Sequence, residues 1–217
     1  MSEGFAPRGL AAVPCGRGGG AMKVVGIVGS MRKDGNTSRL VEAVLGAVRD
    51  AKPKIRTQVV HLSALDVGPC QGCYDLCSKT PYKCVVKDDF QGLLQRMEEA
   101  DGLVIGSPLY YPIPSRLVAL CERVVCLAYF HDLRKHKSAH LLEDKPCALV
   151  AATGGSDPLD VLRYLHGFVL ATRMSPVLRR SYPYYGAAGC GDLAVAPDRP
   201  LEGAAELGRL LADAVEE

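Results

Sequence analysis

The sequence predicts an α/β fold in which a doubly wound parallel sheet of five strands carries helices on both faces. Short apolar runs alternate with longer amphipathic segments along the chain, which is typical of strands connected by helices. Two of the runs, 102–106 and 147–152, are almost wholly apolar, as strands buried on both faces should be. The length of 217 residues and the 48% hydrophobic content suit one domain with a substantial core.

Hydrophobic periodicity places each element in turn. The expected strands are 24–28, 57–62, 102–106, 147–152 and a stretch within 174–180. The expected helices are 37–48, a helix through Phe90 and Met97 capped by Asp88 or Asp89, 115–127, 159–171 and 201–215. In such sheets ligands bind beyond the carboxyl ends of the strands.

The ends of the chain and its composition limit the alternatives. Residues 1–21 are glycine-rich without periodicity and are expected to form a disordered tail, so the domain comprises 22–217. A net charge of +2 gives no reason to expect nucleic acid, and no apolar run is long enough to span a membrane. Without a recognisable secretion signal, a reducing, cytoplasmic environment is expected, in which the nine cysteines would not form a disulfide framework.

The loop after the first expected strand has the character of an anion site. Free amides at a helix start attract phosphate, and the loop adds the donors Ser30, Arg32, Asn36, Thr37 and Ser38. Five residues separate Gly29 from Gly35, and Asn36 follows, so the spacing matches neither a P-loop nor a dinucleotide fingerprint. A polar turn that merely precedes a helix is the alternative.

Two further loops follow the third and fourth expected strands. The first is stiffened by three prolines and offers Pro108, Leu109, Tyr110 and Tyr111 to a flat conjugated ligand. The second offers Thr153, Gly154 and Gly155, whose small size allows a ring edge to approach the backbone. The alternative makes the tyrosines core or interface residues.

Four cysteines lie close together in a loop that spans residues 63–87. Their spacing is Cys70-x2-Cys73-x3-Cys77-x6-Cys84. Four soft ligands in one loop can hold a [4Fe–4S] cluster or a zinc ion, or they can remain free thiols.

Taken together, these stretches resemble the NAD(P)H-dependent FMN reductases of the flavodoxin-like group, and within it the iron–sulfur flavoproteins. The matching segments are 29–38, 70–89, 100–115 and 145–155. The resemblance implies a three-layer sandwich with strand order 2-1-3-4-5, FMN phosphate on the first loop and the isoalloxazine between the other two. The related array usually has two residues between the second and third cysteines, where this chain has three.

The function implied by this resemblance is electron transfer through FMN. NAD(P)H or a cluster would supply electrons to a small acceptor such as a quinone, a flavin or an azo or nitro compound. The alternatives are an electron-transfer protein that serves a partner such as ferredoxin, and a zinc-binding interaction module. The resemblance also implies a homodimer or homotetramer in which one subunit's cluster can lie beside another's flavin.

Overall fold

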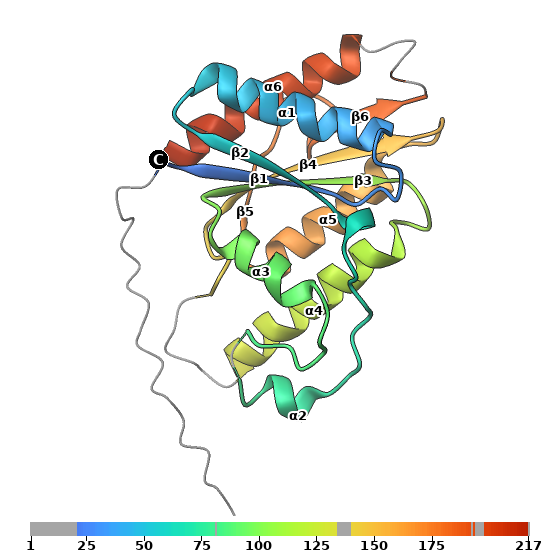
Figure 1. Ribbon diagram of the computed structural model, residues 1–217. Helices are drawn as coiled ribbons and strands as arrows, with labels where there is room; N and C mark the ends of the chain where they lie inside the picture. The colour runs from blue at the N-terminus through green and yellow to red at the C-terminus, as the bar shows by residue number, and fades with distance from the viewer. Residues whose placement is uncertain (1–20, 81, 134–139, 192, 194–197, 217) are drawn as a thin grey trace, which may run out of the picture.

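The chain forms one parallel sheet between two layers of helices (Figure 1). This computed structural model describes residues 21–80, 82–133, 140–191, 193 and 198–216. The tail expected at 1–21 therefore lies, but for Ala21, outside the described residues. Among the residues described, no helix is both long and apolar enough to cross a bilayer.

The sheet confirms the predicted strand order. β2 (Arg56–His61), β1 (Lys23–Val28), β3 (Gly102–Pro108), β4 (Pro146–Thr153) and β5 (Ser175–Pro176) follow one another in space as parallel neighbours. Every residue of β3 and β4 is buried, because helices cover both faces of these central strands.

The fifth strand position is divided in two, which the sequence did not predict. Only Ser175–Pro176 of the expected stretch 174–180 pairs with β4, at its start. The chain then leaves the sheet in a loop closed by the Arg179 N–H, which donates to the Tyr184 carbonyl at 2.8 Å. It returns as β6 (Ala187–Cys190), which pairs in parallel with the second half of β4.

The helices form two layers with separate cores. α1 (Asn36–Ala51) and α6 (Asp198–Glu216) cover one face of the sheet, whereas α3 (Phe90–Glu98), α4 (Ser115–Leu133) and α5 (Leu159–Ala171) cover the other (Figure 1). Alternation along β1 supplies both cores, because Val24 and Val28 point to the first layer and Val25 and Ile27 to the second.

Two short helices lie between β2 and α3. They are η1 (Leu62–Ala64) and α2 (Tyr74–Cys77), and α2 lies inside the cysteine-rich loop. In Figure 1, α2 lies alongside α4 at the outer side of its layer. Helix α4 continues to Leu133, six residues beyond the end that its sequence pattern predicted.

Candidate functional site

The three loops expected to bind a ligand meet at the carboxyl edge of the sheet. Backbone hydrogen bonds join them in sequence across the strands. The Gly29 N–H donates to the Gly106 carbonyl at 2.8 Å, and the Leu109 N–H donates to the Ala152 carbonyl at 2.8 Å. The Gly191 N–H, just after β6, donates to the Thr153 carbonyl at 2.9 Å. The loops therefore form one continuous surface.

The first loop presents an uncapped helix start. Gly35 is the N-cap residue of α1 and no side chain caps the helix, so its first amides remain available to an anion. The Ser30 hydroxyl accepts the Arg32 N–H at 3.1 Å, and the Arg32 side chain is exposed. Ser38 is buried, and its Oγ has no hydrogen-bond partner. An orphaned hydroxyl beside free amides fits a phosphate group.

The other two predicted residues of this loop, Asn36 and Thr37, contact neighbouring segments of the protein. Asn36 Nδ2 donates to the Gly191 carbonyl at 2.6 Å and so ties the helix start to the end of β6. Thr37 is buried, and its methyl group packs against Gly106, where a Cβ would lie 3.1 Å from it and closer still to Val41 and Val150. These two residues shape the loop, whereas Ser38 and the free amides are its available donors.

The second loop exposes its tyrosines. Tyr110 is 52% exposed and Tyr111 is fully exposed, so neither fills the core. The Tyr110 N–H donates to the Pro112 carbonyl at 2.9 Å across a cis Tyr111–Pro112 peptide. Buried Ile113 anchors the segment. Pro108 and Leu109 complete the predicted set at the end of β3.

The third loop is open and small. Thr153 Oγ1 donates to the Ser156 carbonyl at 2.7 Å and closes the turn. Gly154 and Gly155 are exposed and have empty space where a Cβ would stand, and Gly155 has φ of +145°. A planar group can approach the backbone closely here.

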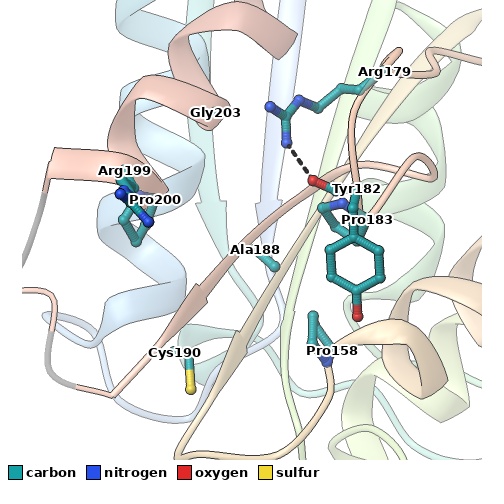
Figure 2. Close-up of a pocket in the computed structure, with 9 residues that line it drawn as sticks. All are labelled: Pro158, Arg179, Tyr182, Pro183, Ala188, Cys190, Arg199, Pro200 and Gly203. Atoms are coloured by element: carbon teal, nitrogen blue, oxygen red, sulfur yellow. Dashed lines mark hydrogen bonds between the residues drawn. The ribbon is translucent and has the colours of Figure 1, made fainter.

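A cavity of about 700 Å³ adjoins this edge (Figure 2). The sequence did not predict it. It lies between β6, the start of α6 and the loop before α5. Its lining includes Pro158, Arg179, Tyr182, Cys190 and Arg199. These residues are scattered over four segments, and only the division of the fifth strand brings them together.

Three polar contacts shape this cavity. Arg179 Nη2 pairs with Glu206 of α6 at 2.6 Å, and its Nη1 donates to the Tyr182 carbonyl at 3.5 Å (Figure 2). The Tyr182 hydroxyl donates to Asp157 Oδ1 at 2.6 Å, and this hydrogen bond lowers the pKa of the Asp157 carboxyl.

The cysteine-rich loop is tied to α3 and α4. Asp88 Oδ2 accepts the Gly68 N–H at 2.9 Å and pairs with Arg123 Nη1 at 2.5 Å. Arg123 is buried, lies over the Phe90 ring and also donates to the Gly68 carbonyl at 3.2 Å. Gln91 holds the other end of the loop, since its Oε1 accepts the Cys84 N–H at 3.2 Å.

The thiols of this loop gather around a fifth cysteine, Cys126 of α4. Cys70 and Cys126 line the same cavity between α2 and α4. Burial, followed by the neighbouring Cys77 and Cys70 thiols, raises the pKa of Cys126 to about 12. Cys126 was not predicted as a neighbour of the cysteine-rich loop, because it lies 42 positions after Cys84 in the sequence.

As they lie, these side chains do not surround a single ion. In the described ranges, no three His, Cys, Asp or Glu side chains are placed as the ligands of one metal. The zinc interpretation therefore gains no support from the geometry. The expectation of a [4Fe–4S] cluster gains no support from this geometry either.

Comparison with known proteins identifies the class to which this fold and site belong. A family model described as NADPH-dependent FMN reductase matches residues 22–183, so the chain belongs to that family. An iron–sulfur flavoprotein of Methanocaldococcus jannaschii is 33% identical over 203 residues, which cover 89% of this chain and 97% of the relative. An iron–sulfur flavoprotein of Archaeoglobus fulgidus is 28% identical over 90% of this chain and 81% of its own length.

Solved structures show the same fold. RosB with a bound flavin-derived intermediate matches with a TM-score of 0.68 at 16% identity, over 90% of this chain and 79% of its own. An NADH:FMN oxidoreductase in its apo form matches with a TM-score of 0.60 at 16% identity, over 90% of this chain and 89% of its own. The predicted flavodoxin-like architecture is thereby confirmed.

Proposed function

We propose that this protein is an FMN-dependent oxidoreductase that takes electrons from NAD(P)H and delivers them to a small acceptor such as a quinone, a flavin or an azo or nitro compound. The observation that carries this proposal is the uncapped start of α1, with the orphaned Ser38 hydroxyl, on the edge where the three loops meet. When bound, FMN supplies the hydride and electron chemistry.

The residues of this chain would bind, orient and expose that cofactor. The first amides of α1, Ser38 and Arg32 would hold the phosphate. Leu109, Tyr110 and the small turn at Gly154 would flank the ring. Tyr111, which is fully exposed, would border the open face where donor and acceptor enter.

The test is anaerobic turnover by the FMN-loaded protein with NADH or NADPH and either a quinone or an azo dye. We expect oxidation of at least one nicotinamide nucleotide, dependent on the acceptor. Tyr111→Ala should raise the KM for the acceptor with little change in stability, because its side chain is fully exposed. Tyr164→Ala, on the surface of α5, is the matched control. FMN-loaded protein that oxidises neither nucleotide would contradict the proposal.

A second candidate is an iron–sulfur flavoprotein that passes electrons to or from a protein such as ferredoxin. It is supported by the names of the relatives. In this form a [4Fe–4S] cluster would be bound in the cysteine-rich loop. Reduction of the bound FMN by reduced ferredoxin, but not by NAD(P)H, would select this candidate over the first.

The position of the thiols supports a homodimer or homotetramer. Cys126 lies eleven residues after Ser115, which is about 16 Å along α4 from the helix end that adjoins the tyrosine loop. A second subunit would bring its own flavin closer to these thiols. Sedimentation of the FMN-loaded protein should give a dimer or tetramer.

We also propose a cytoplasmic location, since reduced thiols persist in reducing compartments.

A further inference from the structure

The cavity beside β6 has the dimensions and the lining of a small-molecule site. Its volume of about 700 Å³ is typical of pockets that bind small ligands. The apolar part of its wall includes the Tyr182 ring together with Pro158, Pro183, Ala188 and Pro200 (Figure 2). An aromatic ring among prolines suits a flat, largely apolar molecule.

This cavity adjoins the loops that are proposed to bind FMN. Cys190 lines it, and the next residue, Gly191, is bonded to both neighbouring loops. The Gly191 N–H donates to the Thr153 carbonyl of the third loop at 2.9 Å, and the Gly191 carbonyl accepts Asn36 Nδ2 at the start of α1 at 2.6 Å. A molecule in the cavity would therefore lie next to the proposed flavin site.

The Tyr182 side chain is held at both ends. Its hydroxyl donates to Asp157 Oδ1 at 2.6 Å, and its backbone carbonyl accepts Arg179 Nη1 at 3.5 Å. A second ring, that of Tyr184, packs edge-on against it with the ring centroids 6.1 Å apart. Although Tyr182 is half-exposed, its ring is thus a fixed flat surface at the cavity.

Arg179 keeps donors available to this cavity. A guanidinium carries five N–H donors. In Arg179, Nε and Nη2 donate to Glu206 Oε2 at 3.0 and 2.6 Å, and Nη1 donates to the Tyr182 carbonyl. Within the described residues, one N–H on each Nη then has no acceptor. An anion can therefore be bound by a guanidinium that stays paired with Glu206.

Arg199 supplies a cation without a counter-charge. It lines the same cavity from the start of α6, and its side chain is exposed. Across the described ranges no carboxylate pairs with it, whereas Glu206 is paired with Arg179 and Asp157 accepts the Tyr182 hydroxyl. Two guanidinium groups at one cavity, one of them unpaired, favour an anionic ligand.

We propose that this cavity binds a flat molecule that carries a carboxylate or phosphate group. Arg199 and the available donors of Arg179 would hold the anion, and the Tyr182 ring would contact the flat part. The inference rests on the proposed function, because the bound molecule would be a substrate that enters beside FMN. Two substrates have this chemistry: an aromatic acceptor with a carboxylate, and NADPH with the 2′-phosphate of its adenosine.

The test measures binding to the oxidised, FMN-loaded protein without an electron donor, so that no turnover occurs. Two pairs of probes each differ in one anionic group: methyl red against its methyl ester, and NADP⁺ against NAD⁺. In one of the pairs we expect the anionic member to bind about tenfold more tightly, because a charge-assisted hydrogen bond contributes that much. The pair that discriminates identifies the substrate.

Variants of the two arginines assign this preference to the cavity. Arg199→Ala and Arg179→Lys should each reduce it to about threefold or less, since Lys keeps the charge beside Glu206 but has fewer donors. Arg209→Ala is the matched control, because Arg209 is exposed on the same helix and does not line this cavity. It should leave the preference unchanged.

Cys190 reports where the probe binds. Its exposed thiol lines the cavity, so the anionic probe should slow its alkylation by iodoacetamide, followed by mass spectrometry. Cys84, a partly exposed thiol of the cysteine-rich loop, is the control and should react at an unchanged rate.

Equal binding within both pairs would overturn the proposal, as would a tenfold preference that persists in either arginine variant, or a Cys190 that the probe does not protect. Thermal unfolding and FMN content verify that the variants fold. If Arg179→Lys does not fold, the exposed Arg199 decides the outcome. Turnover of a nicotinamide nucleotide without discrimination in either pair would refute the cavity assignment alone. Discrimination without turnover would refute the reductase function alone.

Discussion

At the scale of single residues, Ser38 tests the anion site most sharply. Its buried hydroxyl has no partner within the protein, so Ser38→Ala removes no internal hydrogen bond. A hydrogen bond to a charged group contributes about 1.5 kcal/mol or more, so the Kd for FMN should rise about tenfold while stability of the FMN-free protein stays nearly constant. Fluorescence titration with FMN measures the change. Ser63, whose hydroxyl is also buried and unpartnered but lies in η1, is the control for which Ser→Ala should leave binding unchanged.

Asp88 carries a buried charge that stabilises the fold. Burial favours the neutral form of its carboxyl, but hydrogen bonds from Arg123 and from the amides of Gly68 and Phe90, with the Arg123 charge, outweigh burial and lower its pKa. Asp88→Asn leaves the guanidinium of Arg123 buried without a counter-charge and should lower the free energy of unfolding by about 3 kcal/mol at pH 7. Asp89→Asn, at the exposed neighbouring position, should cost far less.

The pH dependence of this effect follows from the direction of the shift. A carboxyl whose pKa is lower in the folded state stabilises the fold above its unfolded pKa of about 3.9 and loses that contribution as the pH falls through the folded value. The difference in unfolding free energy between wild type and Asp88→Asn should therefore be constant from pH 7 to about pH 5 and shrink below about pH 4. Urea titrations across this range measure it, and a difference that grows on acidification would contradict the account.

At the scale of elements, the contact between α1 and α6 depends on a glycine. A Cβ on Gly208 of α6 would collide with the Val44 carbonyl and lie 2.7 Å from the Ala47 Cβ, both on α1. Gly208→Ala must push the helices apart, which should cost about 1–3 kcal/mol. Gly167 of α5 has open space around it, so Gly167→Ala should instead stabilise the protein by up to about 1 kcal/mol. Thermal unfolding of the two variants should shift in opposite directions, and equal shifts would refute this packing argument.

The sequence predicted elements best where burial dictates composition. β1, β3 and β4 are apolar because both of their faces are covered, and α5 agrees with its predicted bounds. β6 was missed because Ala187–Cys190 contains only small residues and pairs with half of one strand. Its β-propensity is too weak to distinguish it from a loop.

At the scale of the whole molecule, the sequence predicted the three loops at the carboxyl edge of the sheet. It did not predict the cavities that distant segments form. Alternating strands and helices determine that loops after β1, β3 and β4 converge, and hydrogen bonds at Gly29, Leu109 and Thr153 join them. By contrast, the cavity beside Arg179 and the cavity shared by Cys70 and Cys126 depend on how distant segments pack. Local patterns contain no information on such contacts.

The central claim is that the loop opening at Gly29 and the start of α1 bind the phosphate of FMN. The most direct measurement is titration of the FMN-free protein with FMN, followed by quenching of flavin fluorescence, with riboflavin as the phosphate-free comparison. The account predicts saturation at one FMN per chain with a Kd of about 1 µM or lower, and much weaker binding of riboflavin. Equal affinity for the two flavins, or no quenching at micromolar FMN, would contradict it.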